Sequence, residues 1–497
     1  MNFSKSKYCD LWQCPKMAWL NKYKPYEREE DSAALSRMEE GNRVGELAKR
    51  LFGDSEDATV RNEDGTPDLH AMIERTSFFI SQGTETICEA SFDKNGLYCA
   101  VDLLHRENGG YAIYEVKSAT HIRDRYLADA AYQKYVLSEC GVKVSGVYIV
   151  TVNSKYLMRN ELNIHEFFSV TEVSELIAEE YEHIESNLAA AEKLLDSDVE
   201  PNVDISELCA KGYACGYWKY CTRHLPKPSV FDVYKMQYAK KLAYYRSGIV
   251  SFEDLRSSGE ITDSIRVRQI EHALEDRGTY ADKEGIKEFL SKLYYPLYFL
   301  DFESMQPVIP VYEYTKPYSQ IVFQYSLHFI ESEGGALKHK EFLAESGPDP
   351  RRAVAERLCR DIPENACVLA YNKTFECTRI RELADLFDDL SERLNALADG
   401  IVDLLEPFQK GYCYNRAMGS SFSIKSVLPA LYPDDPSLDY HNLEGVHNGG
   451  EAMDIFPRIK DMPPLDAEKA RHDLLKYCEL DTLAMVKVWQ ELIRLSK

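Results

Sequence analysis

The stretch LYFLDFES, residues 297–304, places two carboxylates within an almost continuous apolar and aromatic run. A short run of this kind is typical of a buried β-strand. Side chains at positions i and i+2 of a strand point to the same face, so Asp301 and Glu303 are expected to lie side by side. Buried carboxylates repel each other and resist desolvation unless cations or hydrogen bonds compensate them. The sequence therefore raises the question of what holds these two acids together.

Length and composition are typical of a soluble globular protein with two to four domains. The chain has 497 residues, of which 44% are hydrophobic and 28% charged. No apolar run approaches the roughly 20 residues that span a bilayer. The N-terminal MNFSKSKYCDLWQCPK lacks the apolar core of a secretory signal. We therefore expect a cytoplasmic protein with no membrane partner.

The charge and the cysteine count narrow the classes of partner. A formal net charge of -23 argues against a surface coated in basic residues for nonspecific nucleic-acid binding. It leaves room for a local basic groove on an acidic body. The 13 cysteines are an odd number, and without an export signal a disulfide framework is not expected. A tight cluster of cysteines would indicate a metal site.

Pattern changes along the chain predict an α/β multi-domain protein in three parts. Residues 1–225 mix helices and strands and include a long amphipathic helical stretch over 167–197. The second part, residues 226–292, begins within the linker-like LPKPS of residues 225–229 and reads as helical over 230–290. Residues 293–497 begin with strands and continue with helices, the order of an α/β domain.

Further acidic residues follow predicted strands or lie on predicted helices of the C-terminal part. The run VLAYNKTFECTRIRELADLF indicates a short strand and then a helix that Asn372 caps, with Glu376 in its first turn. Asp403 follows an apolar pair in GIVDLLEPF. Tyr477 and Asp481 lie four residues apart on the predicted terminal helix, so they share one face.

This order of residues resembles the DnaQ-like 3′-5′ exonucleases of the ribonuclease H superfamily, in the subgroup called DEDDy. The matching elements are the D-x-E of Asp301-Phe302-Glu303, the N-x-x-F-E run from Asn372 to Glu376, the candidate Asp403, and the Y-x-x-x-D from Tyr477 to Asp481. Glu376 replaces the Asp that is usual in the second motif. The run GSSFSIKSVLPALYP, residues 419–433, is either a phosphate contact or an ordinary capped helix.

The resemblance implies a nuclease site with two divalent ions, Mg²⁺ or Mn²⁺, which prefer carboxylate and water oxygens. It implies that Asp301 bridges the ions, that Glu303 and Asp481 complete their shells, and that Tyr477 orients the attacking water. Asp403 is assigned to the same shells. Whether Glu376 or Asp403 binds metal directly stays open.

A second constellation lies in the N-terminal part. The runs YCAVDLL and YAIYEVKSA are expected to be adjacent strands joined by the turn HRENGG. Asp102 lies on the first strand, and Glu115 and Lys117 share a face of the second. An Asp and an E-x-K across a hairpin resemble the PD-(D/E)XK nucleases. That resemblance implies a divalent ion on the two acids, assisted by a main-chain carbonyl such as that of Val116, with Lys117 supporting the nucleophilic water or the phosphate.

Two flanking helices extend this likeness to the RecB-like members. The helix YLADAAYQKYVLSECG carries Gln133 at the family's Gln position, with Leu137 four residues on. The helix EEGNRVGELAKRLFG resembles the family's G-x-x-x-H helix, but Gly45 stands where the metal-binding His belongs. Glu46 is adjacent and Glu40 lies one turn earlier, so the third side-chain ligand stays open.

The spacing of four cysteines resembles the iron–sulfur RecB-like nucleases, which include AddB and the CRISPR-associated exonucleases. Cys14 lies near the N-terminus, and Cys209, Cys215 and Cys221 follow the nuclease core. Cys9 is an alternative to Cys14. The C-x5-C-x5-C spacing differs from the family's usual C-x2-C-x5-C. Four thiolates suit a [4Fe–4S] cluster, and zinc is the alternative.

The sequence thus predicts a fusion of two nucleases. Residues 1–225 would form the RecB-like iron–sulfur domain, 226–292 a helical connecting domain, and 293–497 the DnaQ-like exonuclease. Single-stranded DNA is the expected substrate, with aromatic residues available for base stacking. DNA repair, CRISPR adaptation and phage defence all use such parts. The rivals are a nucleic-acid-binding protein with one inactive site, more readily the N-terminal one, and a zinc or thiol–redox scaffold.

Overall fold

The computed structural model describes residues 3–31, 34–210 and 215–497. The chain folds into two compact units. The first comprises Met1–His224 and Pro307–Ser319, and the second comprises Leu225–Gln306 and Gln320–Lys497. Both units combine helices with β-sheets, so the predicted mixed α/β, multi-domain class is confirmed.

The compact units divide the chain differently from the three consecutive ranges expected from sequence. The helical segment 226–292 belongs to the second unit, where the Arg268 guanidinium donates to the carbonyl of Gly411 at 2.5 Å. The segment 307–319 leaves the second unit and belongs to the first. There the Met158 N–H donates to the carbonyl of Thr315 at 3.1 Å.

The first unit is built on one sheet whose strand order is β2-β3-β4-β5-β6-β7, with β1 pairing along β4. Its strands are β1 (Phe3–Ser4), β2 (Glu56–Asp57), β3 (Thr86–Lys94), β4 (Leu97–Glu107), β5 (Gly110–Val116), β6 (Val144–Val152) and β7 (Phe168–Glu172). The predicted hairpin of β4 and β5 is confirmed. Asn108 and Gly109 have φ of 51° and 70°, the left-handed pair that a tight two-residue hairpin turn requires.

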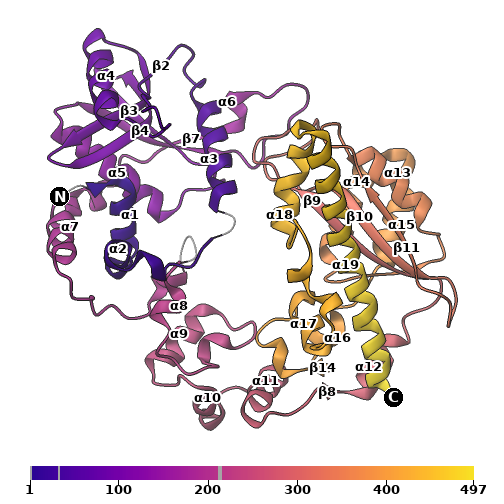
Figure 1. The fold of residues 1–497 in the computed structure, drawn as a ribbon. Coiled ribbons are helices and arrows are strands. Elements are labelled where there is room, and N and C mark those ends of the chain that lie inside the picture. Colours follow the sequence, from indigo (N-terminus) through magenta and orange to yellow (C-terminus); the bar gives the residue numbers. More distant parts are fainter. Residues whose placement is uncertain (1–2, 32–33, 211–214) are drawn as a thin grey trace. The chain divides into compact units, whose positions relative to one another are not determined.

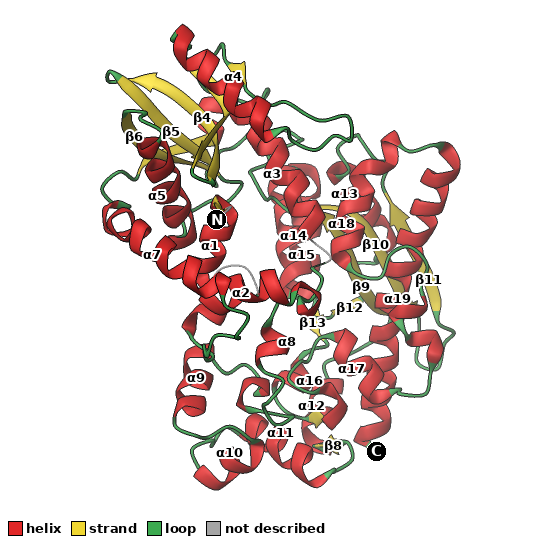
Figure 2. Cartoon of the chain, turned by 60° about the vertical axis from the view of Figure 1, so that its left-hand side comes forward, coloured by secondary structure: helices red, strands yellow, loops and turns green. Residues whose placement is uncertain are grey.

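The helices of the first unit lie before, between and after these strands. They are α1 (Lys5–Gln13), α2 (Pro15–Tyr23), α3 (Ala34–Ala48), α4 (Leu69–Gln82), α5 (Asp124–Glu139), α6 (Ile164–Phe167), α7 (Ala178–Asp196) and α8 (Trp218–Cys221). Helix α5 connects the parallel strands β5 and β6, packs on the sheet, and is covered in turn by α1 and α7 (Figure 2).

The expectation of one helical stretch over 167–197 is wrong in its first part. Phe168–Glu172 form β7, which pairs antiparallel with β6, and the helix begins only at Ala178. The edge of β6 offers this segment a complete hydrogen-bond ladder, and Phe168 is buried there. Tertiary pairing therefore overrides the local helical pattern.

The second unit contains a sheet of order β11-β10-β9-β12-β13 and a small ribbon of β8 and β14. The strands are β8 (Tyr280–Ala281), β9 (Leu297–Met305), β10 (Ile321–Ile330), β11 (Lys338–Leu343), β12 (Cys367–Ala370), β13 (Val402–Asp403) and β14 (Cys413–Tyr414). Strands β9, β10 and β11 are antiparallel, whereas β9, β12 and β13 are parallel. The strand predicted for LYFLDFES is confirmed as β9, the middle strand of this sheet.

Helices cover both faces of the second unit's main sheet. The helices of the second unit are α9 (Tyr238–Arg246), α10 (Phe252–Ser258), α11 (Ser264–Glu275), α12 (Lys283–Leu290), α13 (Arg351–Asp361), α14 (Thr374–Leu386), α15 (Asp388–Gly400), α16 (Glu406–Gln409), α17 (Ile424–Leu431), α18 (Gly449–Ile455) and α19 (Pro464–Ser496). Leu300 and Phe302 of β9 join the apolar core with α13, α14 and α15. Phe299 points to the other face and meets Trp489 of α19, the long yellow helix of Figure 1.

This alternation along β9 decides where its carboxylates go. Asp301 and Glu303 share the face of Phe299, so they point to the side of the sheet that α19 covers. Within the described ranges, no helix is both long enough and apolar enough to cross a membrane.

Candidate functional site

The second unit brings Asp301 and Glu303 against α19. The β-sheet register places Asp301 opposite Ser326 and Glu303 opposite Gln324. The Cys478 thiol of α19 lies 3.7 Å from a carboxylate oxygen of Asp301. One ligand atom each from Asp301, Glu303 and Cys478 lies within 4.8 Å of the other two. The two acids of the strand therefore face the helix that carries Tyr477 and Asp481.

Tyr477 and Asp481 are held by partners from the segment between β14 and α19. The Tyr440 hydroxyl donates to Asp481 Oδ1 at 2.6 Å. Lys425 of α17 donates from Nζ to the Tyr477 hydroxyl at 2.9 Å, and it lies 4.9 Å from the ring centroids of both tyrosines. Lys425 belongs to the run in which sequence left a phosphate contact or a capped helix open. No local sequence pattern predicted its hydrogen bond to Tyr477.

Burial and mutual repulsion shift the ionisation of these acids. Burial, followed by the charges of Asp481 and Glu303, raises the pKa of Asp301 well above its usual range. Burial and then Asp481 do the same to the pKa of Glu303. Burial raises the pKa of Asp481 to about 6, although the Tyr440 hydrogen bond and Lys425 oppose the shift. These three carboxylates act on one another as one buried cluster.

Glu376 and Asp403 adjoin this cluster in different ways. Glu376, in the first turn of α14, is only 3% exposed, and its Oε2 has no hydrogen-bond partner among the described residues. Burial, with a contribution from Asp403, raises the pKa of Glu376 to about 8. Asp403 Oδ1 accepts the backbone N–H groups of Asn372 at 3.0 Å and Leu405 at 2.9 Å. Glu376 thus has one oxygen without a hydrogen-bond partner among the described residues, whereas Asp403 Oδ1 already accepts two backbone N–H groups.

The predicted cap of α14 is wrong. The N-cap position is Lys373, and no side chain makes a capping hydrogen bond there. Asn372 instead has a φ of 65°, and its N–H is engaged by Asp403. Asn tolerates this left-handed conformation better than most residues.

The donor set of this acidic cluster fits a hard divalent cation. Its ligands are carboxylate oxygens, the atoms that Mg²⁺ and Mn²⁺ prefer. Lys425, which lowers the pKa of Glu303 and Asp481, is a single positive charge facing several carboxylates. The unpartnered Oε2 of Glu376 and the raised pKa values are the observations expected of a buried anionic site whose counter-charge is not supplied by the chain.

The first unit brings Asp102, Glu115 and Lys117 together at β4 and β5. The Val116 N–H donates to Asp102 Oδ2 at 2.6 Å, and Lys117 Nζ donates to Glu115 Oε1 at 2.5 Å. Glu115 is almost completely buried. Burial, together with the charges of Asp102 and Asp129, raises the pKa of Glu115 to about 7.

The sequence did not predict two residues of this site, Asp129 and Lys5. Asp129 of α5 accepts from Lys117 Nζ at 2.7 Å, and the nearby lysines hold its pKa well below the usual range despite burial. Lys5, the first residue of α1, donates from Nζ to Glu115 Oε1 at 3.1 Å. Burial opposes its charge, but Glu115, Asp129 and Asp102 raise the pKa of Lys5 well above the usual value. Both residues reach the site through tertiary packing, which no local pattern announces.

Gln133 lies within the same site. Its Nε2 donates to Glu115 Oε2 at 2.7 Å and to Asp129 Oδ1 at 2.9 Å. Its Oε1 is buried without a hydrogen-bond partner among the described residues. The amide nitrogen of Gln133 therefore bridges two acids. Its amide oxygen is left as an unused acceptor that is chemically suited to bind a metal ion.

Gly45 leaves the third side-chain metal ligand of this site unassigned. A candidate for that ligand lies on β3 rather than on α3. Glu46 is exposed and pairs with Lys49, so the structure does not bring it to the site. Glu89 of β3 lies between Cys88 and Ala90, which pair with Leu103 and Val101 of β4, and it has a φ of 54°. Burial raises the pKa of Glu89, Lys5 lowers it, and Glu115 raises it. A strained non-glycine residue beside two acids is a common feature of functional sites.

The residues of this first site fit a divalent ion less simply. Carboxylate oxygens of Asp102 and Glu115 and the unused Oε1 of Gln133 are suitable donors. However, Lys5 and Lys117 already donate to Glu115. Here Lys5 and Lys117 supply the positive charge. A divalent ion that binds this site must displace these lysine side chains from Glu115.

The four candidate cysteines line one cavity of about 500 Å³ in the first unit. Cys14 lies at the N-terminus of α2, where burial raises its pKa and the N–H groups of Met17 and Lys16 oppose that shift. Cys221 has a pKa raised to about 11 by burial, with further contributions from the other cysteines. Residues 211–214, between Cys209 and Cys215, lie outside the described residues.

The spacing of these sulfur atoms bears on the choice of metal group. Among the described residues, no three of the four sulfurs lie within 4.8 Å of one another. Zinc with thiolates at 2.3 Å needs them about 3.8 Å apart. A [4Fe–4S] cluster is the other group that binds four thiolates.

Comparisons with known proteins give relatives without an assigned activity. A family model described as a domain of unknown function, DUF2779, matches residues 298–423. The chain is 26% identical over 232 residues to the "Uncharacterized protein MG366 homolog" of Mycoplasma pneumoniae, covering 42% of this chain and 34% of that protein. It is 25% identical over 226 residues to "Uncharacterized protein UU173" of Ureaplasma parvum, covering 40% and 32%. The chain thus spans about a third of the length of the curated relatives it matches.

The raised pKa of Glu376 predicts a pH-dependent stability in the presence of a chelator. Because its folded-state pKa of about 8 exceeds the ordinary 4.5, its contribution to stability is complete below that ordinary value and is lost as pH rises through about 8. We expect Glu376→Gln to be more stable than the wild type at about pH 9, by on the order of a few kcal/mol, and to differ little near pH 4. Thermal unfolding in EDTA measures both.

Exposed Glu392, on α15, provides the matched control for this experiment. Glu392→Gln should follow the wild type at every pH. A stability difference between Glu376→Gln and the wild type that stays constant from pH 4 to pH 9 contradicts the assigned ionisation.

Proposed function

We propose that this chain is a metal-dependent nuclease that hydrolyses phosphodiester bonds of DNA, acting as an exonuclease on single strands. The observation that carries the proposal is the buried cluster of Asp301, Glu303 and Asp481 with Glu376 beside it. In this proposal the second unit is a DnaQ-like domain with a ribonuclease H-like fold. The antiparallel strands β9 to β11 followed by parallel β12 and β13 support that fold.

The chemistry of phosphodiester hydrolysis explains why these residue types gather. Two divalent ions, Mg²⁺ or Mn²⁺, would stabilise negative charge on the phosphate and activate water when bound. Asp301, Glu303 and Asp481 would hold them, with Glu376 offering its free oxygen more readily than Asp403. This favours Glu376 for the choice that sequence left open, because Asp403 Oδ1 already accepts two backbone N–H groups.

Tyr477 has the position of a residue that orients an attacking water. Its hydroxyl accepts a hydrogen bond from Lys425, so its own proton is directed elsewhere. Burial and the charges of Asp481 and Glu303 raise its pKa far above the usual value, so it stays a neutral hydrogen-bond donor. Lys425 fixes the hydroxyl and adds positive charge where a phosphate would lie.

The first unit is proposed to be a RecB-like PD-(D/E)XK domain. The hairpin of β4 and β5, the helix α5 and the parallel strand β6 occur in the order that this fold requires. Lys117 would support the nucleophilic water or the scissile phosphate, and Gln133 would position Glu115. Cys14, Cys209, Cys215 and Cys221 are proposed to bind a [4Fe–4S] cluster in their shared cavity.

A second candidate function rests on the first unit. Both Lys5 and Lys117 donate to Glu115, so the anionic charge there is already compensated by the chain. This favours a first unit that binds nucleic acid without cutting it, while the second unit performs hydrolysis. The two candidates differ in whether hydrolysis that depends on Lys117 remains when the second unit's site is disabled by Asp301→Asn.

A degradation assay on end-labelled single-stranded DNA with Mn²⁺ tests the proposal. We expect Asp301→Asn to reduce hydrolysis by roughly 100-fold or more, because it removes a charge that the reaction needs. The exposed acid Glu468 lies on the same helix as Asp481, and Glu468→Gln should retain full activity. If the first unit only binds, adding Lys117→Ala to Asp301→Asn should remove no further activity. Equal activity of the wild type, Asp301→Asn and Lys117→Ala would contradict the nuclease proposal.

Anaerobic purification tests the iron–sulfur proposal separately. The wild type should contain iron and show a broad absorption in the visible range, which Cys221→Ser should abolish. Cys359 is a partly exposed cysteine of the second unit, and Cys359→Ser should leave both iron and absorption unchanged. Zinc in place of iron, with no visible absorption, would overturn the assignment.

A further inference from the structure

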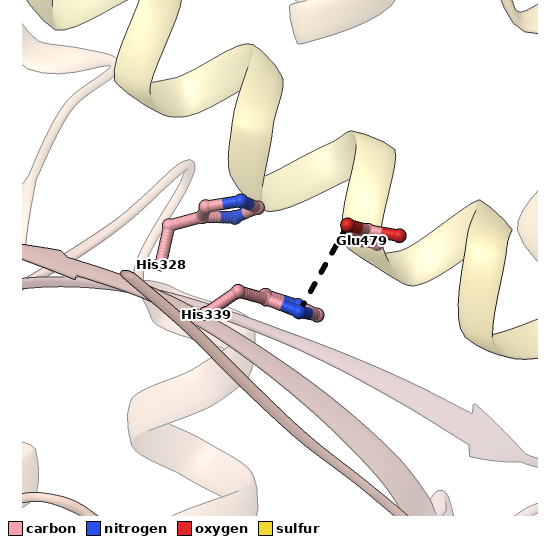
Figure 3. Close-up of side chains that lie close together, drawn as sticks. All are labelled: His328, His339 and Glu479. Carbon is pink, nitrogen blue, oxygen red and sulfur yellow. Dashed lines mark ion pairs between the residues drawn. The ribbon is translucent and has the colours of Figure 1, made fainter. Parts of the chain in front are cut away.

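Two histidines and a glutamate come together on the face of the second unit's main sheet that α19 covers. His328 of β10 and His339 of β11 are direct cross-strand neighbours, and their ring centroids lie 4.5 Å apart. Figure 3 shows both rings beside Glu479 of α19, with His339 Nδ1 lying 3.9 Å from Glu479 Oε1. One ligand atom from each of the three residues lies within 4.8 Å of the other two.

The outer ring nitrogens are fixed by two hydroxyl groups. His328 Nδ1 lies 2.8 Å from Thr482 Oγ1, and His339 Nε2 lies 2.9 Å from Ser326 Oγ. The two hydroxyls contact each other at 2.7 Å. Thr482 Oγ1 is also 3.1 Å from the carbonyl of Glu479, an acceptor without a proton of its own.

One arrangement of protons satisfies all of these contacts. Thr482 donates its single hydroxyl proton to the Glu479 carbonyl, and it therefore accepts from Ser326 and from His328 Nδ1–H. Ser326, having donated, accepts from His339 Nε2–H. Each neutral imidazole carries one N–H, so His328 Nε2 and His339 Nδ1 are left as lone pairs.

These two lone pairs and Glu479 Oε1 form a cluster of acceptors with no donor between them among the described residues. His328 Nε2 has no hydrogen-bond partner among the described residues, and the 3.9 Å from His339 to Glu479 exceeds a hydrogen bond. Lys476 donates at 2.7 Å to the other carboxylate oxygen of Glu479, Oε2.

We propose that His328, His339 and Glu479 form a binding site for a divalent transition metal, with Zn²⁺ as the ion that this donor set favours. Two imidazole nitrogens and one carboxylate oxygen are zinc ligands, and imidazole is not a ligand that Mg²⁺ prefers. The hydroxyls of Thr482 and Ser326 supply the outer hydrogen bonds that orient metal-binding histidines and fix their tautomers. Ligand atoms within 4.8 Å require only small side-chain adjustments to share one ion.

The location of this site gives it a structural consequence. Its ligands come from β10, β11 and α19, so a bound ion joins two strands to the helix that carries Tyr477 and Asp481. Glu479 lies between those two residues in sequence. The zinc site is chemically distinct from the carboxylate cluster, and it does not depend on the proposed nuclease activity.

Zinc titration of the full-length chain, in excess Mg²⁺ to occupy oxygen-rich sites, tests the proposal. We expect Glu479→Gln and His339→Ala to bind one zinc ion fewer than the wild type. Both side chains are partly exposed, so these variants should fold. Zinc should raise the unfolding temperature of the wild type more than that of either variant. Asp301→Asn, which alters the carboxylate cluster, should retain the zinc ion and so separates this site from the nuclease proposal.

Cobalt provides a second readout that distinguishes this site from the cysteines. Co²⁺ on nitrogen and oxygen ligands should give visible bands without the near-ultraviolet thiolate absorption, and Glu479→Gln should lose these bands. Equal zinc stoichiometry in the wild type, Glu479→Gln and His339→Ala would overturn the proposal. A cobalt spectrum made only of thiolate bands would do so as well.

Discussion

Buried negative charge that the chain does not neutralise is the constraint around which the second unit is built. Asp301 and Glu303 of β9 form a buried cluster with Asp481 of α19, and each has a pKa above its usual range because of burial. The pKa of Glu376, about 8 against 4.5, corresponds to on the order of 5 kcal/mol of cost for its charged form. An apolar replacement would remove this cost, which supports the proposal that these acids bind a divalent cation.

The first unit contains a similar cluster of buried acids, but lysine side chains neutralise it. Asp102, Glu115 and Asp129 face Lys5 and Lys117, and the pKa values of Asp129 and Lys117 move in the directions expected of ion pairs. Positive charge from Lys5 of α1 and from Lys117, directly after β5, thus stabilises the site without a metal ion. The two units therefore differ in what they need from solution: the second requires an external cation or protons, whereas the first can exist with its charges paired.

The sequence predicted features that depend on neighbours along the chain. Alternation along β9 placed Asp301 beside Glu303, and the Asn108-Gly109 turn indicated the hairpin. Lys5, Asp129, Lys425 and Tyr440 could not be predicted, because only tertiary packing brings them to their sites. The pairing of His328 with His339 depends on a β-sheet register that sequence does not specify. The expected helix over residues 167–197 was wrong at its start for the same reason, since β6 offered β7 a hydrogen-bonding edge.

Anomalous X-ray diffraction from crystals grown with Mn²⁺ is the most direct measurement of what compensates the acids of the second unit. We predict a manganese peak bonded to Asp301 and to at least one of Glu303 and Asp481. Carboxyl groups that hydrogen-bond to one another as neutral acids, with no manganese at Asp301, would contradict the claim that a divalent cation holds this site together.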